Sequence, residues 1–105
     1  MAIVPGAPAR AADIAAMQQT GTELITFSTL DSFTTTVTFP TPFTSAPVMA
    51  APNINTGAGA AGRWDSRAIN ITNTGFTLWV FSNASGATSS WSNIPVQWLA
   101  VVDVV

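Results

Sequence analysis

The amino-acid sequence predicts an all-β protein, a six-stranded antiparallel β-sandwich with a short N-terminal helical arm. The first observation is that short segments rich in β-branched and aromatic residues recur between prolines, glycines, asparagines and serines. The second is that apolar residues occupy alternate positions in these segments, as Phe76, Leu78 and Val80 do. The third is the length of 105 residues, which suits one small domain.

Residues 1–21 predict the arm. Two prolines and a glycine near the start indicate an extended lead, and the alanine-rich residues 9–19 predict a short helix that ends at Gly21. Its apolar residues, Ile14 and Met17, are too few to stabilise so short a helix alone. The helix could pack against its own domain. We favour an arm that anchors the protein to a larger particle or forms a three-fold bundle.

Residues 22–105 predict the sandwich. Six segments have strand composition and are bounded by turn-forming residues. They are Glu23–Ser28, Thr34–Phe39, Pro47–Ala51, Arg67–Thr72, Phe76–Ser82 and Pro95–Val104. The Asn73-Thr74-Gly75 sequence predicts a hairpin turn. Two long connections, residues 52–66 and 83–93, are expected to carry binding residues, as loops at the end of a rigid sandwich commonly do.

The last predicted strand has two apolar faces. One face includes Trp98 and Ala100, and the other includes Leu99, Val101 and Val105. An antiparallel strand with one face in solvent ordinarily alternates with polar residues. Only 8% of the residues are charged, so little charge is available to keep surplus apolar surface in water. We therefore expect Leu99, Val101 and Val105 to contact a neighbouring subunit.

The composition argues against several classes of function. Histidine, cysteine, lysine and tyrosine are absent, so the many hydroxyls have no histidine base and an enzyme is not expected. Three arginines and a formal net charge of −2 do not make a nucleic-acid-binding face. No metal or cofactor is expected, because no loop is rich in metal ligands. The longest apolar stretch, residues 94–105, is too short to span a membrane, and the N-terminus lacks the basic segment of a signal peptide.

The densest polar cluster predicts a sugar contact. It runs from Arg63 to Arg67 and includes Asp65. Arginine and aspartate give oriented hydrogen bonds to hydroxyl pairs, and an indole ring stacks on the apolar patch of a pyranose. Arg67 and Asp65 are therefore candidates, with Trp91 as a nearby stacking ring. The alternatives are an ion pair between Asp65 and an arginine, and a core position for Trp91.

Three segments resemble the H-type lectin domain, the fold of certain invertebrate agglutinins and of a discoidin C-terminal domain. They are residues 37–48, residues 67–78 with their Thr-Gly-Phe motif, and residues 91–100. The resemblance implies a six-stranded sandwich that assembles as a homotrimer. It also implies binding of galactose-type sugars between neighbouring protomers.

The resemblance extends to individual site residues. Arg67 lies eight residues before Gly75 and matches a sugar-contacting arginine of the family. The family's aromatic–histidine pair, eight and nine residues after that glycine, falls here on Asn83 and Ala84. The family's fold and trimer are therefore expected, whereas its sugar specificity is not.

Similar domains occur in bacteriophage virion proteins, and the N-terminal segment resembles the attachment stub of such proteins. The resemblance implies a virion-surface protein, either a capsid decoration or a tail accessory, that docks on capsid or tail proteins through its arm. It would offer a lectin-like face to host-surface glycans. The alternatives are a soluble carbohydrate-binding lectin and a purely structural cementing protein that binds no sugar.

Overall fold

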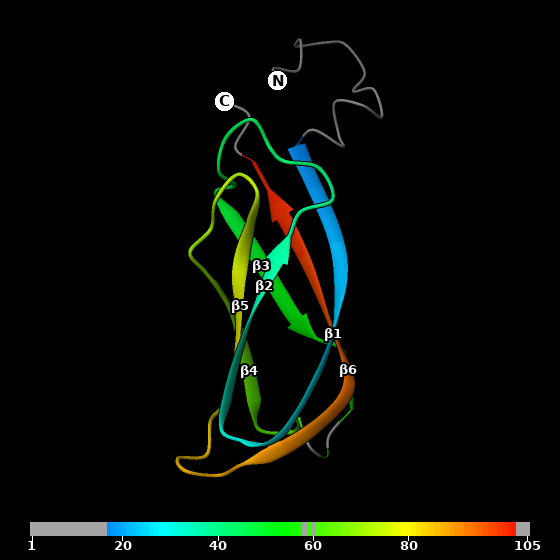
Figure 1. Cartoon of the computed structure of the whole chain (residues 1–105), viewed down its shortest axis with the longest axis vertical. Coiled ribbons are helices and arrows are strands. Elements are labelled where there is room, and N and C mark those ends of the chain that lie inside the picture. Colours follow the sequence, from blue (N-terminus) through cyan, green and yellow to red (C-terminus); the bar gives the residue numbers. More distant parts are fainter. Residues whose placement is uncertain (1–16, 58, 60, 103–105) are drawn as a thin grey trace.

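The protein is a sandwich of two three-stranded antiparallel sheets (Figure 1). The computed structural model describes residues 17–57, 59 and 61–102. The strands are β1 (Gln18–Leu30), β2 (Ser32–Thr38), β3 (Met49–Ile54), β4 (Trp64–Ile69), β5 (Gly75–Ser82) and β6 (Ser89–Val101). Their order is β1-β6-β3 in one sheet and β2-β5-β4 in the other, so β6 and β5 are the central strands. The predicted all-β class with six antiparallel strands is confirmed.

The strand pairing places the two ends of the described chain side by side. Gln18 at the start of β1 pairs with Val101 at the end of β6. The backbone N–H of Val102 also donates a hydrogen bond of 2.8 Å to the carbonyl of Met17. The β5–β6 loop lies at the opposite end of the sandwich (Figure 1). The start of β1 therefore lies far from that loop.

Aromatic side chains fill much of the space between the sheets, in two clusters. In the first, neighbouring ring centroids lie 5.1 to 5.3 Å apart among Phe27, Phe33, Trp64 and Trp91. In the second, they lie 5.0 to 5.9 Å apart among Phe39, Phe43, Phe76 and Trp98. Most pairs are tilted or edge-on, the arrangements that aromatic quadrupoles favour. Buried aliphatic residues such as Val37, Leu78 and Val96 complete one core.

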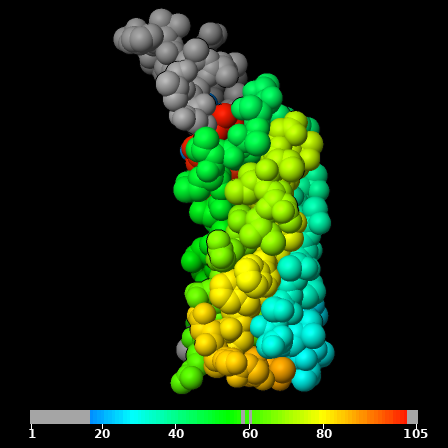
Figure 2. Space-filling model, turned by 90° about the vertical axis from the view of Figure 1, so that its left-hand side faces the viewer, coloured from blue at the N-terminus to red at the C-terminus, as the bar shows by residue number. Residues whose placement is uncertain are grey.

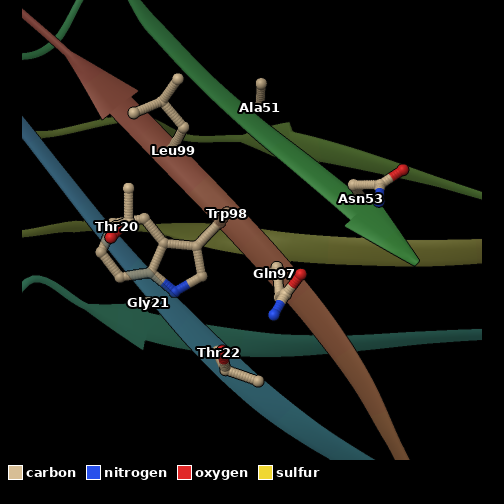
Figure 3. A pocket seen from close by; sticks show the side chains of 8 residues that line it. All are labelled: Thr20, Gly21, Thr22, Ala51, Asn53, Gln97, Trp98 and Leu99. Atoms are coloured by element: carbon tan, nitrogen blue, oxygen red, sulfur yellow. The ribbon is translucent and has the colours of Figure 1, made fainter. Parts of the chain in front are cut away.

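Two strand glycines allow close approaches in this core. A Cβ on Gly75 would lie 2.1 Å from the carbonyl oxygen of Val37, so the Thr-Gly-Phe motif requires glycine at its centre. A Cβ on Gly21 would lie 2.5 to 2.8 Å from atoms of the Trp98 indole. The indole of Trp98 thus covers the bare backbone of β1 at Gly21 (Figure 3). Glycine in a strand interior is typical of such close contacts.

The boundary predicted between arm and sandwich, at residue 22, is too late. β1 begins at Gln18, and residues 18–21 pair with residues 98–101 of β6. The local sequence favours a helix or a turn there, but pairing with the apolar end of β6 outweighs that preference. Met17 adjoins the strand, and Ile14, with the rest of the predicted helix, lies outside the described residues.

Candidate functional site

Alternation along β4 places two predicted sugar-contacting residues on the outside of the sandwich. Trp64 points inward and is buried, whereas Asp65 and Arg67 are exposed. Successive side chains of a strand point to opposite faces, so Asp65 and Arg67 share the outer face of the β2-β5-β4 sheet. We call this outer face, which also carries Thr34, Trp79 and Phe81, the Arg67 face.

The strand register assembles a row of three side chains across the Arg67 face. Trp79 on β5 pairs with Thr34 on β2 and with Arg67 on β4. Side chains directly opposite each other have Cβ atoms about 5 Å apart. The indole therefore has a hydroxyl on one side and a guanidinium on the other. Figure 2 looks onto this side of the molecule, where cyan β2 runs beside yellow-green β5.

The next row places a second ring beside the indole. Phe81 pairs with Ser32 on β2 and with Asp65 on β4. The ring centroids of Trp79 and Phe81 lie 4.5 Å apart, with 36° between their planes. The other phenylalanines and tryptophans belong to the core or pack against it. Trp79 and Phe81, both half-buried, are thus a pair of rings on an outer face.

Asp65 is held by the β5–β6 loop and not by an arginine. Its Oδ2 accepts a hydrogen bond of 2.5 Å from Asn83 Nδ2. The backbone N–H of Asn83 donates to the carbonyl of Arg63 at 2.8 Å. Within residues 61–102 no ion pair joins Asp65 to Arg63 or Arg67, so the ion-pair alternative is wrong. The exposed guanidinium of Arg67 has its donors available to a ligand.

Trp91 is a core residue, which corrects its assignment as a stacking ring. Its exposed fraction is 2%, and its ring lies 5.1 Å from those of Phe27 and Trp64. The serine-rich stretch expected to be a loop belongs to β6, which begins at Ser89, so Trp91 alternates into the sandwich. Among the described residues its Nε1–H has no hydrogen-bond partner.

Trp79 and Phe81 are the residues of this face that the sequence reasoning missed. A mid-strand tryptophan is ordinarily a packing residue. The alternation of Phe76, Leu78 and Val80 nevertheless fixes their neighbours in the sequence to the opposite, outer face. Large aromatic residues at two outward positions of one strand were the sequence signal for a binding surface.

The outer face of the β1-β6-β3 sheet carries the predicted subunit contacts. Leu99 and Val101 point outward from β6 and are half-buried, while Val105 lies outside the described residues. A shallow hollow of about 380 Å³ crosses the three strands beside Leu99 (Figure 3). Its other lining residues are Thr20, Gly21, Thr22, Ala51, Asn53, Gln97 and Trp98. We call this outer face the Leu99 face.

Residues 17–57, 59 and 61–102 contain no group of three histidine, cysteine, aspartate or glutamate side chains that could hold a metal ion. Among the same residues, no helix is long and apolar enough to cross a membrane.

Comparison with protein families identifies the fold. The H-type lectin domain matches residues 34–101, which is more than half of the chain. The chain therefore belongs to the H-type lectin domain family, and the resemblance predicted from the sequence is confirmed. Comparison with curated proteins gave no match.

Three solved structures share this fold. The tailspike protein gp49 from Pseudomonas phage LKA1 has a TM-score of 0.64 and 22% identity, over 85% of this chain and 16% of the tailspike. The Pseudomonas phage phi297 tailspike gp61 has a TM-score of 0.60 and 18% identity, over 84% and 16%. The N-truncated R1-type pyocin tail fiber has a TM-score of 0.57 and 18% identity, over 87% and 75%. The chain thus spans 16% of the length of each tailspike.

Proposed function

We propose that this chain is a non-enzymatic, trimeric surface component of a phage-type virion, with a lectin-like face that contacts host-surface glycans. The observation that carries the proposal is the H-type lectin domain over residues 34–101 on a fold shared with tailspikes and a tail fibre. This combination favours a particle component over a soluble lectin.

Arg67 is the proposed glycan contact. It is exposed on the Arg67 face, and its guanidinium can donate several hydrogen bonds to sugar hydroxyls. Asp65 lies two residues away on the same face and adds an acceptor. A donor and an acceptor held on a rigid strand suit the orientation of a hydroxyl pair.

The Leu99 face is the proposed contact between subunits. Leu99 and Val101 are half-buried although they face outward, and their partners on β1 and β3 carry no charge. Those partners are Gln18, Thr20, Met49 and Ala51. Three copies can bring such surfaces together without repulsion between like charges.

Attachment to the particle is proposed for the N-terminal residues, as the sequence predicts. The chain enters the sandwich at Gln18, at the end opposite the β5–β6 loop (Figure 1). A particle bound at that end would leave the loop end pointing away from the particle and the Arg67 face uncovered on the side of the sandwich. Either a capsid or a tail is compatible with this geometry.

A glycan array with the intact protein and two variants tests the glycan contact. Arg67→Ala should weaken binding of any retained glycan by about 1–3 kcal/mol, the loss expected for a charge-assisted hydrogen bond. Arg63→Ala is the matched control, because it removes an exposed arginine that precedes β4. Equal affinities for wild type and Arg67→Ala would contradict the assignment.

A structural cementing role without sugar binding is the second candidate. At the positions of the family's aromatic–histidine pair, Asn83 holds Asp65 and Ala84 lies in a tight turn, where its carbonyl accepts from Ala87 at 2.9 Å. An array on which the trimer retains no glycan, together with particles that lose stability without this protein, would select this candidate.

A further inference from the structure

We propose that Trp79 is the stacking ring of a saccharide site on the Arg67 face, and that this site selects a neutral pyranose over an acidic one. The inference rests on the proposed glycan contact of Arg67. The observation that carries it is the strand register, which places the indole directly between the Arg67 and Thr34 side chains.

Trp79 is the tryptophan whose ring is accessible. The chain has four tryptophans, and the exposed fractions of Trp64, Trp91 and Trp98 are 8%, 2% and 5%. Trp79 is half-buried and lies outside the core and its packing layer. A pyranose needs an accessible ring face on which its apolar C–H groups can stack. Among the tryptophans, Trp79 meets this requirement.

The ring is held in place before any ligand arrives. Its centroid lies 4.5 Å from that of Phe81, which faces outward from the same central strand. β5 is paired on both sides, with β2 and with β4. A side chain that is already ordered loses less conformational entropy on binding than a ring on a flexible loop. This position therefore suits a binding ring.

The polar groups around the ring determine the class of sugar. Arg67 supplies hydrogen-bond donors, Asp65 supplies a carboxylate acceptor, and Thr34 supplies a hydroxyl that does both. A pair of neighbouring sugar hydroxyls can accept from Arg67 and donate to Asp65. A sugar carboxylate attracted by Arg67 would also meet the Asp65 carboxylate, which Asn83 fixes in place. Such like-charge contact disfavours acidic sugars at this site.

The indole N–H signals of the four tryptophans provide a direct test by NMR. The intact protein, labelled at tryptophan, is titrated with the methyl glycosides of glucose, galactose and mannose and with the corresponding methyl uronides. Each neutral glycoside differs from its uronide only at the carboxylate. We expect a neutral glycoside to shift the Trp79 signal and to leave the signals of the three buried indoles nearly unchanged. The matching uronide should shift the Trp79 signal only at higher concentrations.

Variants separate stacking from general damage. Trp79→Ala should weaken binding roughly tenfold or more, as for an aromatic anchor residue. Trp79→Phe should recover part of the affinity because it restores a ring. Leu24→Ala is the matched control, since Leu24 is 62% exposed on the other sheet and its loss should leave binding unchanged. Thermal unfolding of each variant shows that the fold is retained.

Each outcome decides the proposal. Suppose that glycan binding depends on Arg67, yet the glycan does not shift the Trp79 signal and binds Trp79→Ala as tightly as wild type. This result would overturn the inference and leave the proposed function intact. Uronides that bind as well as their neutral partners would overturn the sugar class. If Trp79→Ala dissociates into monomers, the Arg67 face is a subunit contact, and the inference is overturned. No binding by any glycan would remove the proposed glycan contact and this inference together.

Discussion

Replacing Gly75 with alanine tests the explanation given for the Thr-Gly-Phe motif. The new Cβ would lie 2.1 Å from the Val37 carbonyl oxygen and 3.2 Å from the Thr38 Cα, whereas ordinary contacts begin at 3.4 Å. The obstacle is backbone of the paired strand β2, so no side-chain rotation relieves it. The backbone of β2 or β5 would therefore have to shift to relieve the contact.

The structure sets the size of this effect. Overpacking of a tight interior costs about 1–3 kcal/mol, and each weakened backbone hydrogen bond adds about 1 kcal/mol. Gly75→Ala should therefore lower the free energy of unfolding by about 3 kcal/mol. For a domain of this length, that corresponds to a drop in Tm of roughly 12–24 °C.

The assay is thermal unfolding followed by circular dichroism, with all proteins at one concentration because assembly makes Tm concentration-dependent. Gly57→Ala is the matched control, since a Cβ at Gly57 meets nothing within 4 Å. The free energy of unfolding of this control should lie within about 1 kcal/mol of the wild-type value, and any change should be an increase. A Gly75→Ala protein as stable as this control would refute the steric reasoning.

Two further predictions concern the assembly. Val101→Asp should convert the proposed trimer to monomers in light scattering, because the new charge would be buried without a partner between subunits. Thr36→Asp on the other sheet is the control and should leave the assembly unchanged. A wild type that is already monomeric would contradict the subunit contact. Deleting residues 2–16 leaves every described strand complete, so Tm should change little while incorporation into particles is lost. Normal incorporation of the truncated chain would refute the anchoring role.

The sequence was sufficient to predict those features that strand periodicity controls. The final strand has apolar residues at both odd and even positions, and the structure places Trp98 in the core and Leu99 on an outer face. These assignments needed only the two-residue period of a strand and a decision about which face is buried.

The remaining errors arose where long-range pairing controls the structure. Residues 18–21 have no strand signal of their own, and they are in β1 because β6 pairs with them. Trp91 lies in a serine-rich stretch, and it is buried because β6 extends to Ser89 and turns the ring toward Phe27. Neither the partner strand nor its register can be read from the local sequence.

The location of Trp79 explains how a site on this fold can change without loss of the core. Inward residues of β5, such as Leu78 and Val80, are fully enclosed, so their volumes are constrained by packing. Trp79 lies between them in the sequence but faces the other way, where no core packing restricts its size. Because the ring is on the strand, the β5–β6 loop need not supply it, and Asn83 of that loop donates a hydrogen bond to Asp65 instead. The proposed stacking ring can therefore lie on the strand, and not on the loop, without any change in the sandwich.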